Sequence, residues 1–362
     1  MNYSKKGIKE RQKSLHASSH KWSKKLLLAV MNLMVLGILA IGVIGASAGI
    51  GVFKGIIDTA PSIENIDVTP TGFSTFVYDL EGNQIGKLIA QDSNRIPVAK
   101  DMIPENLAHA FVAIEDERFY EHNGIDIKGI IRAAYVGISN GFHFTEGAST
   151  ITQQLLKNNV FTNWTSESTQ LERFTRKIQE QYLAVQVEKK TDKDTILENY
   201  LNTINLGAGS YGVQAAARQY FDKDIWDLNL SECATLAGIT QNPSRFDPIQ
   251  NPKDNAKRRK DVLQHMLDQN YITQEQFDAA LNDDVYSRIQ AAQDATSQTK
   301  DKIYTYFEDE LTDQIINDLM NIKGYTKKQA TNLLYSGGLK VYTTQDSKIQ
   351  NILDEELSLI HI

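Results

Sequence analysis

Cysteine and proline are scarce in this chain, and each shortage excludes a class of protein. Cys233 is the single cysteine among 362 residues, so neither an internal disulfide nor a cysteine-rich zinc site can hold the fold. With only 7 prolines and 22 glycines, a collagen-like or proline-rich architecture is excluded as well. The charged fraction of 23% and the apolar fraction of 41% are ordinary for a folded chain of about two domains.

Charge is also absent from one long block of the sequence. Residues 26–53 contain no Asp, Glu, Lys or Arg, whereas residues 1–25 carry eight Lys or Arg and a single acid. Because the whole chain has a net charge of −7, residues 54–362 are acidic. This balance argues against a nucleic-acid partner, which would need a basic surface.

The uncharged block predicts a transmembrane helix. It has 28 residues, of which Asn32 and Ser47 are the only clearly polar ones, and a bilayer core needs roughly 20 apolar residues. A signal peptide would have a shorter apolar region of about 7–15 residues, and a buried core helix is the other alternative. The preceding cations predict a cytoplasmic N-terminus. We therefore expect a basic tail at 1–25, an anchor at 26–53 and a large part of the chain outside the membrane.

After the anchor, the pattern predicts a connector at residues 54–72 and then a folded domain. A β-hairpin is expected at 74–78 and 84–89, because turn residues separate two strand-like runs. From about Pro104 the apolar residues recur with helical spacing, so the region 104–285 is expected to be mainly α. Its helices are expected at residues 127–139, 150–159, 170–189, 193–204, 210–220, 230–240, 252–269 and 273–282.

The C-terminal part has a different pattern. Residues 286–300 are polar, have no apolar periodicity and are therefore expected to be a linker. A further helix is predicted at 304–320 and a strand at 339–344. The sequence stops at Ile362 inside a helical pattern, so we expect it to be a fragment of a longer protein.

Acidic residues are concentrated at the end of the first helical pattern. Glu115, Asp116 and Glu117 follow an apolar run and precede His122 and Gly124. One interpretation is a helix C-terminus with solvated charges and Gly124 as its left-handed cap. The helix macrodipole, however, disfavours acids at that end. The other interpretation is a partly buried Glu115 beside a cleft, where a carboxylate suits a general base.

Small residues lead into the helix expected at 150–159. Thr150 and Gln153 have the spacing of a capping box, which is a sufficient structural reason for both. Gln154 and Lys157 lie one turn apart on the same helix. Near a helix N-terminus, backbone N–H groups and a lysine favour an anion such as phosphate.

Three cations and a carboxylate share one face of the helix expected at 170–189. Arg173, Arg176, Lys177 and Glu180 follow one another at steps of three, one and three residues. One interpretation is a solvated face with Arg176–Glu180 and Lys177–Glu180 pairs, each worth about 0.2–0.5 kcal/mol. The alternative is a cationic group that binds a doubly charged phosphate leaving group.

Together with two later segments, these clusters resemble the glycosyltransferase family 51 domain of class A penicillin-binding proteins and monofunctional peptidoglycan glycosyltransferases. The resemblance extends over about residues 73–285, and Ala148 stands where glycine is commoner in the family. Five segments carry it in order: Glu115-Asp116 with His122 and Gly124, residues 147–154, Arg176-Lys177 with Glu180, residues 196–221, and residues 236–244.

The resemblance implies a lysozyme-like domain at 73–285 with a small jaw that contacts the membrane. Residues 338–344 further resemble the segment that leads into a transpeptidase domain. We therefore expect 286–362 to be a linker and the start of a transpeptidase domain that this sequence lacks. The jaw would contain Phe142, Phe144, Val160, Phe161 and Trp164, which could alternatively be core residues of a loop.

The resemblance also implies an activity, namely polymerisation of lipid II into a β-1,4 glycan with inversion and release of undecaprenyl pyrophosphate. Glu115 would be the general base, and Glu180 the second catalytic carboxylate. A divalent metal, Mg²⁺ or Mn²⁺, could assist the pyrophosphate, and no organic cofactor is needed. The substrate-binding residues would be Asp116, Ser149, Thr150, Gln154, Lys157, Arg176 and Lys177.

The implied setting is a bacterial cell membrane, with the catalytic domain outside. Partners would be lipid II, the growing glycan chain, the lipid bilayer and other proteins of cell-wall synthesis or division. Two alternatives stay open. One is a membrane-anchored lysozyme-like hydrolase, which would not need the cations. The other is an inactive scaffold, against which the intact Glu115 and Glu180 argue.

Overall fold

The computed structural model describes residues 4–15, 18–90, 93–141, 147–161, 164, 166–299 and 306–360. The chain forms two compact units, Met1–Ala60 and Pro61–Ile362.

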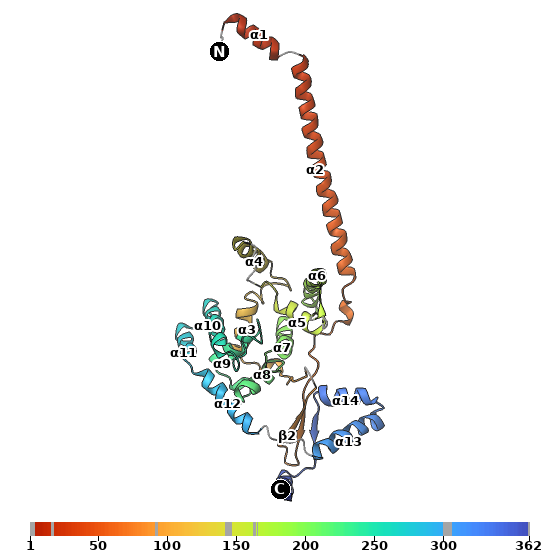
Figure 1. Ribbon diagram of the computed structural model, residues 1–362, viewed down its shortest axis with the longest axis vertical. Helices are drawn as coiled ribbons and strands as arrows, with labels where there is room; N and C mark the ends of the chain where they lie inside the picture. The colour runs from red at the N-terminus through yellow and green to blue at the C-terminus, as the bar shows by residue number, and fades with distance from the viewer. Residues whose placement is uncertain are drawn as a thin grey trace. The chain divides into compact units, whose positions relative to one another are not determined.

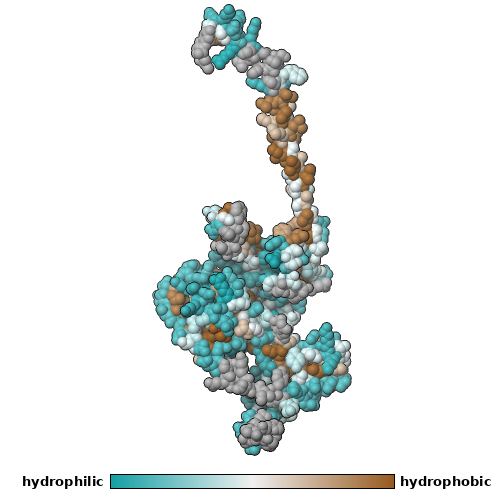
Figure 2. All heavy atoms as spheres, viewed as in Figure 1, coloured by the Kyte–Doolittle hydropathy of each residue, from teal (hydrophilic) through white to brown (hydrophobic). Residues whose placement is uncertain are grey.

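The first unit consists of two helices, α1 (Lys5–Leu15) and α2 (Ser18–Asp58). Within α2, the stretch Lys24–Asp58 is long and apolar enough to cross a membrane, by length and composition. Its large apolar side chains are exposed, and Figure 2 shows hydrophobic residues along much of this helix. A water-soluble helix does not expose an apolar surface of this length. The prediction of one apolar N-terminal helix is confirmed, while its orientation in a membrane stays a prediction.

Most of the second unit is helical, which confirms the mainly α prediction (Figure 1). The predicted helices begin and end within about three residues of the observed ones. The observed elements are η1 (Ile63–Asn65), η2 (Lys100–Met102), α3 (Glu105–Glu115), α4 (Ile127–Ser139), α5 (Ile151–Asn159), α6 (Gln170–Val187), α7 (Lys193–Thr203), α8 (Val213–Phe221), η4 (Ile225–Asp227), α9 (Leu230–Ile239), α10 (Pro252–Asp268), α11 (Gln274–Leu281) and α12 (Val285–Thr299).

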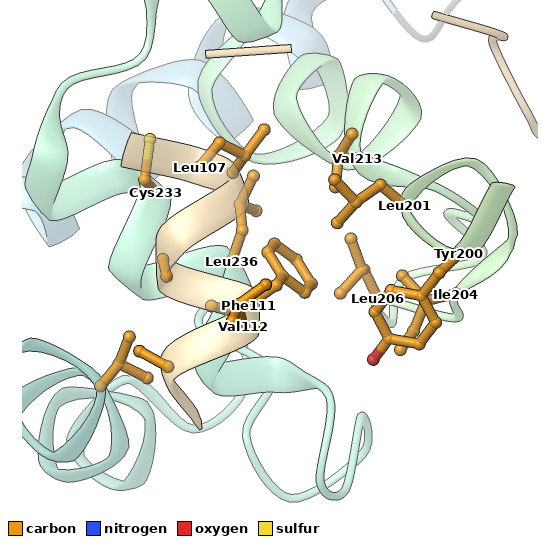
Figure 3. Packing of buried hydrophobic residues seen from close by; sticks show 14 of the residues in the cluster. Leu107, Phe111, Val112, Tyr200, Leu201, Ile204, Leu206, Val213, Cys233 and Leu236 are labelled. Atoms are coloured by element: carbon orange, nitrogen blue, oxygen red, sulfur yellow. The ribbon is translucent and has the colours of Figure 1, made fainter. Parts of the chain in front are cut away.

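One large apolar core holds these helices together. Phe111 of α3 is fully buried and meets the ring of Tyr200 on α7 edge to face, with 6.3 Å between ring centroids. Figure 3 shows Phe111 between Leu236 of α9 and Leu206. α9 is buried from Ser231 to Ile239, and all of these residues except Glu232 are small or apolar. Its N-terminus is closed by a capping box, in which Asn229 and Glu232 exchange hydrogen bonds.

A three-stranded sheet forms a second, smaller core. The predicted hairpin is present as β1 (Thr75–Tyr78) and β2 (Gln84–Leu88), which pair antiparallel. β3 (Lys340–Tyr342) pairs parallel with β1 on the other side, in the order β2-β1-β3. Helices α13 (Tyr306–Lys323) and α14 (Lys327–Ser336) complete this core, and the chain continues into α15 (Ser347–Ile360). The hairpin therefore packs with the C-terminal segment, and the predicted domain boundary at residue 73 stays a prediction.

The described part of the predicted linker at residues 286–300 is helical, and its role as a linker stays a prediction. Residues 285–299 form α12, and Val285 and Ile289 are buried in the main core. Two apolar residues at i and i+4 are enough to dock one helical turn, but they are too few to produce a periodic pattern in the sequence.

Candidate active site

Glu115 is the last residue of α3, and its side chain is partly buried, while its role as a base stays a prediction. Its Oε2 accepts a hydrogen bond from Nε2 of Gln154 at 2.7 Å. Its Oε1 accepts one from the hydroxyl of Thr240, the residue that ends α9. Both oxygens therefore have neutral donors, and no cation forms an ion pair with Glu115 among the residues that the structure describes.

Tyr200 fixes which end of the Gln154 amide faces Glu115. The hydroxyl of Tyr200 donates to Oε1 of Gln154 at 3.3 Å. Burial raises the pKa of Tyr200 well above its ordinary value, and the negative charges of Glu115 and Asp116 raise it further. The phenol therefore keeps its proton and remains a donor. Since the amide oxygen of Gln154 is occupied, its NH₂ group points to the carboxylate.

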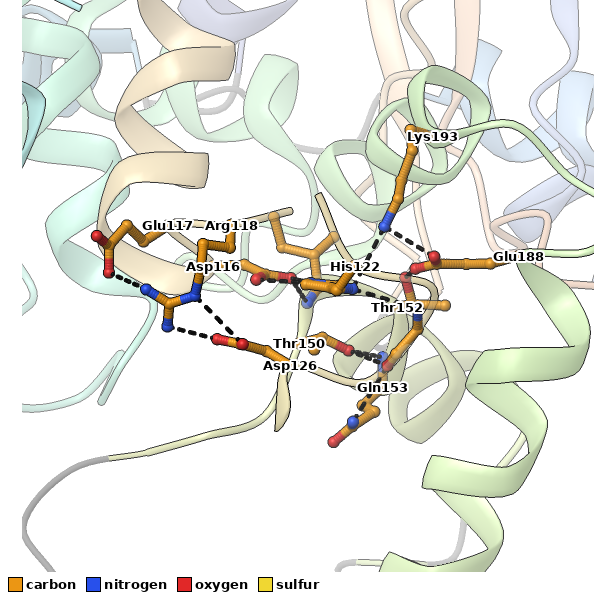
Figure 4. Close-up of polar contacts among 12 residues, drawn as sticks. Asp116, Glu117, Arg118, His122, Asp126, Thr150, Thr152, Gln153, Glu188 and Lys193 are labelled. Atoms are coloured by element: carbon orange, nitrogen blue, oxygen red, sulfur yellow. Dashed lines mark hydrogen bonds and ion pairs between the residues drawn. The ribbon is translucent and has the colours of Figure 1, made fainter. Parts of the chain in front are cut away.

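Asp116 organises the start of α5 together with His122 (Figure 4). Its carboxylate accepts from the backbone N–H of Ile151 at 2.9 Å and lies 2.9 Å from Nε2 of His122. The backbone N–H of Gly124 donates to Nδ1 of His122 at 3.2 Å, so the ring proton sits on Nε2. Asp116 is 5% exposed. Its contact with substrate stays a prediction, which the engagement of its oxygens within the protein does not favour.

Thr150 is the N-cap of α5, as predicted, because its Oγ1 accepts from the backbone N–H of Gln153 at 3.3 Å. The same hydroxyl donates to the carbonyl of Gly124 at 2.8 Å. A capping box would also need the side chain of Gln153 to accept from the backbone N–H of Thr150. This part of the prediction is wrong, because the Gln153 side chain instead donates to the carbonyl of Gly124 at 3.2 Å. Thr150 is only 1% exposed, so its predicted role in substrate binding stays a prediction that its burial does not favour.

The prediction that Gly124 caps α3 is wrong, because α3 ends nine residues earlier, at Glu115. Gly124 does have a positive φ of 87°. An added Cβ there would lie 2.5 Å from the carbonyl carbon of Ala184 on α6. The glycine is therefore required by the close approach of the turn at His122 and Gly124 to the backbone of α6.

We expect Gly124→Ala to lower the free energy of unfolding by about 2–4 kcal/mol, from left-handed strain and a clash with backbone that cannot move aside. Urea unfolding of the full chain in detergent measures the change. Gly147→Ala is the matched control, because Gly147 has open space around its Cβ position and lies in the same region. Equal stability of the two variants would contradict the role assigned to Gly124.

The second carboxylate, Glu180, lies on α6 between two cations. Nζ of Lys177 lies 2.9 Å from its Oε2, and Arg176 donates to its Oε1. Both pairs were expected from the spacing, and both are confirmed. The interpretation as a solvated face is wrong, because the side chain of Glu180 is fully buried. Arg176 also binds the carboxylate of Glu167, which lies before α6, with 2.6 Å between Nε and Oε1.

Further contacts gather the remaining predicted residues around this pair. Lys177 also donates to Oγ of Ser149 at 2.7 Å, which joins α6 to the loop before α5. Lys157 of α5 is half-buried, and its Nζ lies 3.7 Å from the centre of the Trp164 ring. Burial lowers the pKa of Lys157, and the charges of Glu180, Arg176 and Lys177 also act on it. The structure therefore brings Ser149, Lys157, Arg176, Lys177 and Glu180 into one cluster.

An open groove of about 600 Å³ borders the cationic cluster. Its lining combines apolar residues with polar and charged ones, Arg176 among them. Three of the residues predicted for the jaw belong to it, whereas Phe142 and Phe144 lie outside the described residues. The groove is lined by Val160, Phe161, Trp164, Ser166, Glu167, Leu171, Glu172, Thr175, Arg176 and Gln179.

α5 connects the two carboxylate sites. Gln154 on its first turn binds Glu115, and Ser149 just before the helix binds Lys177. Three contributors had no role in the sequence-based prediction, namely Tyr200, Thr240 and Glu167. Tyr200 and Thr240 lie within the segments at 196–221 and 236–244, so the resemblance pointed to their surroundings. Glu167 lies outside all five segments, and its sequence position carries no signal.

This chain is similar to known proteins over most of its length. A family model described as "Transglycosylase" matches residues 81–267. Penicillin-binding protein 1A from two strains of Clostridium perfringens is 38% identical over 358 residues, which cover 96% of this chain and 41% or 50% of the relative. The crystal structure of penicillin-binding protein 1A from Haemophilus influenzae is similar with a TM-score of 0.37 and 26% identity, over 78% of this chain and 28% of that chain. The chain thus spans half or less of the length of these relatives. Since the family model covers more than half of its residues and includes both carboxylates, the chain belongs to the transglycosylase family, as the five segments predicted.

Proposed function

We propose that the chain is a peptidoglycan glycosyltransferase, which polymerises lipid II into β-1,4 glycan strands. The observation that carries the proposal is that α5 and the loop before it connect two carboxylate sites. At one, a partly buried carboxylate is held by neutral donors. At the other, Arg176 and Lys177 pair with a buried carboxylate, and the charge of Lys157 interacts with the same group next to an open groove. Transfer of a sugar from a pyrophosphate requires both a base and a cationic site.

Glu115 acts as the general base in this proposal. The 4-hydroxyl of the acceptor lipid II loses its proton to Glu115 while its oxygen forms the bond to the anomeric carbon of the donor. The bond between that carbon and the pyrophosphate oxygen breaks, and the electron pair leaves with the pyrophosphate, so the configuration inverts. Base catalysis of this kind contributes about 10²–10⁴ in rate. Gln154 and Thr240 hold the carboxylate in one orientation.

The cationic cluster stabilises the leaving group. Negative charge grows on the pyrophosphate in the transition state, and fixed cations stabilise it without reorganising. Lys157, Arg176 and Lys177 supply these charges, and Glu180 holds two of them in place. The apolar residues of the adjacent groove suit the polyprenyl chain that is attached to the pyrophosphate. A glycan hydrolase would have no use for this cluster.

A resident divalent metal does not fit these side chains. Both oxygens of Glu180 are taken up by Arg176 and Lys177. No group of three or more His, Cys, Asp or Glu that could hold a metal ion occurs in the described part of the chain. No step of the mechanism is therefore assigned to Mg²⁺ or Mn²⁺.

Membrane attachment is part of the proposal. The apolar stretch of α2 would anchor the chain in the bacterial cell membrane with the N-terminus in the cytoplasm. The folded unit also exposes a stripe of large apolar side chains on α4, at helical spacing, which would enter the membrane interface near the lipid-linked substrate. The stripe consists of Ile127, Ile131, Tyr135 and Ile138. Other cell-wall proteins are the expected partners.

Incubation of the detergent-solubilised chain with labelled lipid II tests the proposal. We expect glycan polymers and release of undecaprenyl pyrophosphate. Soluble muropeptides from purified cell wall, without polymer from lipid II, would instead identify a hydrolase. If neither product forms, the scaffold interpretation remains.

A further inference from the structure

The hydroxyl of Thr240 has more hydrogen-bond acceptors than it has protons. It lies within hydrogen-bond distance of Oε1 of Glu115 and 2.9 Å from the carbonyl oxygen of Ala237. Both partners accept hydrogen bonds when Glu115 is ionised, and a threonine hydroxyl carries one proton. It can therefore donate to only one of them at a time.

The conflict disappears once Glu115 is protonated. The carboxylic acid then donates from Oε1 to Oγ1 of Thr240, which donates in turn to the carbonyl of Ala237. All three groups are satisfied, and no heavy atom has to move. The site thus offers hydrogen-bond partners for both protonation states of Glu115.

We propose that Thr240 is a positioning residue for the general base, whose hydroxyl donates to ionised Glu115 before the reaction and turns to Ala237 when Glu115 takes up the acceptor's proton. The inference rests on the proposed function, in which Glu115 is the base. The proton of the acceptor hydroxyl ends on Glu115, and the hydroxyl proton of Thr240 only rotates about its own oxygen. No proton is gained or lost by Thr240.

The other contact to Glu115 cannot follow a proton in this way. The NH₂ group of Gln154 is a donor only, and Tyr200 holds its amide in that orientation. Gln154 therefore favours the charged carboxylate throughout. The hydroxyl of Thr240 can donate to ionised Glu115 and accept from protonated Glu115. It is therefore the contact that can change direction when Glu115 gains or loses a proton in each catalytic cycle.

The groups around Glu115 supply no other adjustable donor among the described contacts. Its chain neighbour Asp116 is engaged by Ile151 and His122. The remaining groups that face this end of α3 are Gln154 from α5, Tyr200 from α7, Thr240 from α9 and, at the end of α10, Gln269 on the carbonyl of Ala113.

Thr240→Val removes the hydroxyl and keeps the shape of the side chain. The variant loses a donor to the ionised base, so we expect kcat for lipid II polymerisation to fall about tenfold while KM changes less than about twofold. The acid limb of the kcat profile should move to higher pH, because the hydrogen bond that the ionised base loses is charge-assisted and therefore stronger than the one that the protonated acid loses. Thr240→Ser restores the hydroxyl and should recover at least half of the wild-type kcat.

Thr235→Val is the matched control. Thr235 lies on the same helix, and its hydroxyl also bonds a backbone carbonyl, that of Ser231, at 2.8 Å. It forms no described contact with Glu115, so its pH profile should match the wild type. An unshifted profile in Thr240→Val, or no recovery in a folded Thr240→Ser, would overturn the inference. Absence of polymerisation by the wild-type chain would instead overturn the proposed function, so the two failures are distinguishable.

Discussion

Glu115→Gln is expected to lower lipid II polymerisation at least a hundredfold while the protein remains folded and binds lipid II. The substitution removes a base that contributes about 10²–10⁴ in rate. The fold should tolerate it, because an amide can satisfy both present contacts. Its oxygen can accept from Gln154, and its NH₂ group can donate to Thr240, which then donates to Ala237. Turnover of labelled lipid II, binding of lipid II and thermal unfolding measure the three quantities.

Glu117→Gln is the matched control for this change. Glu117 is two residues along the chain, is 41% exposed and pairs with Arg118 and Arg132 at the surface. The same loss of charge should leave turnover within about twofold, since exposed pairs contribute little. More than a tenth of wild-type turnover in Glu115→Gln would contradict the role of Glu115 as the base. Loss of lipid II binding in that variant would show that the carboxylate acts in binding instead.

Much of the fold was predictable because its signals are local. Apolar spacing predicted the helices from α3 to α11, and capping residues also mark the starts of α5, α6, α7, α9 and α11. The ion pairs within α6 follow from i, i+3 and i, i+4 neighbours on one helix. The prediction failed where the cause lies elsewhere in the chain. α12 exists because two residues reach the main core, and Gly124 is required by the backbone of Ala184, 60 residues further on.

The same distinction separates the predicted site residues from those that were missed. Glu115, Gln154 and Lys177 could be selected because their residue types suit a base or an anion site. Thr240 is an ordinary helix-terminal residue until α9 packs against α3 and brings it to Glu115, 125 positions away. The burial of Glu180 is also a tertiary effect, because a stripe of charges on a helix looks the same in sequence whether or not another element covers it.

The burial of Glu180 changes what the loss of a neighbouring cation should do. For a solvated stripe, Lys177 could be removed with almost no effect on stability. In the structure, Lys177 is one of two cations that compensate a fully buried carboxylate, and its own side chain is 39% exposed. Its removal should therefore lower the melting temperature, although by less than for a fully buried pair, because water screens part of the interaction.

Lys177→Gln separates the catalytic contribution from this structural one. Glutamine can still donate to Ser149 or Glu180, so we expect the melting temperature to fall by only about 2–4 °C, equivalent to about 1 kcal/mol. Polymerisation should fall about ten- to hundredfold, because a fixed positive charge near the leaving pyrophosphate is lost. Inhibition by undecaprenyl pyrophosphate should weaken in parallel, since the product carries the same charged group.

Lys190→Gln removes an equal charge from an exposed position after α6 and is the control for net charge. It should change neither turnover nor product inhibition. If Lys177→Gln keeps wild-type turnover and inhibition, the cluster around Glu180 is structural, and the pyrophosphate must be bound elsewhere. If turnover falls while the affinity for the product is unchanged, Lys177 acts on the transition state alone, where charge on the pyrophosphate is still growing. Comparing the two losses in one variant therefore shows at which stage of the reaction the cation acts.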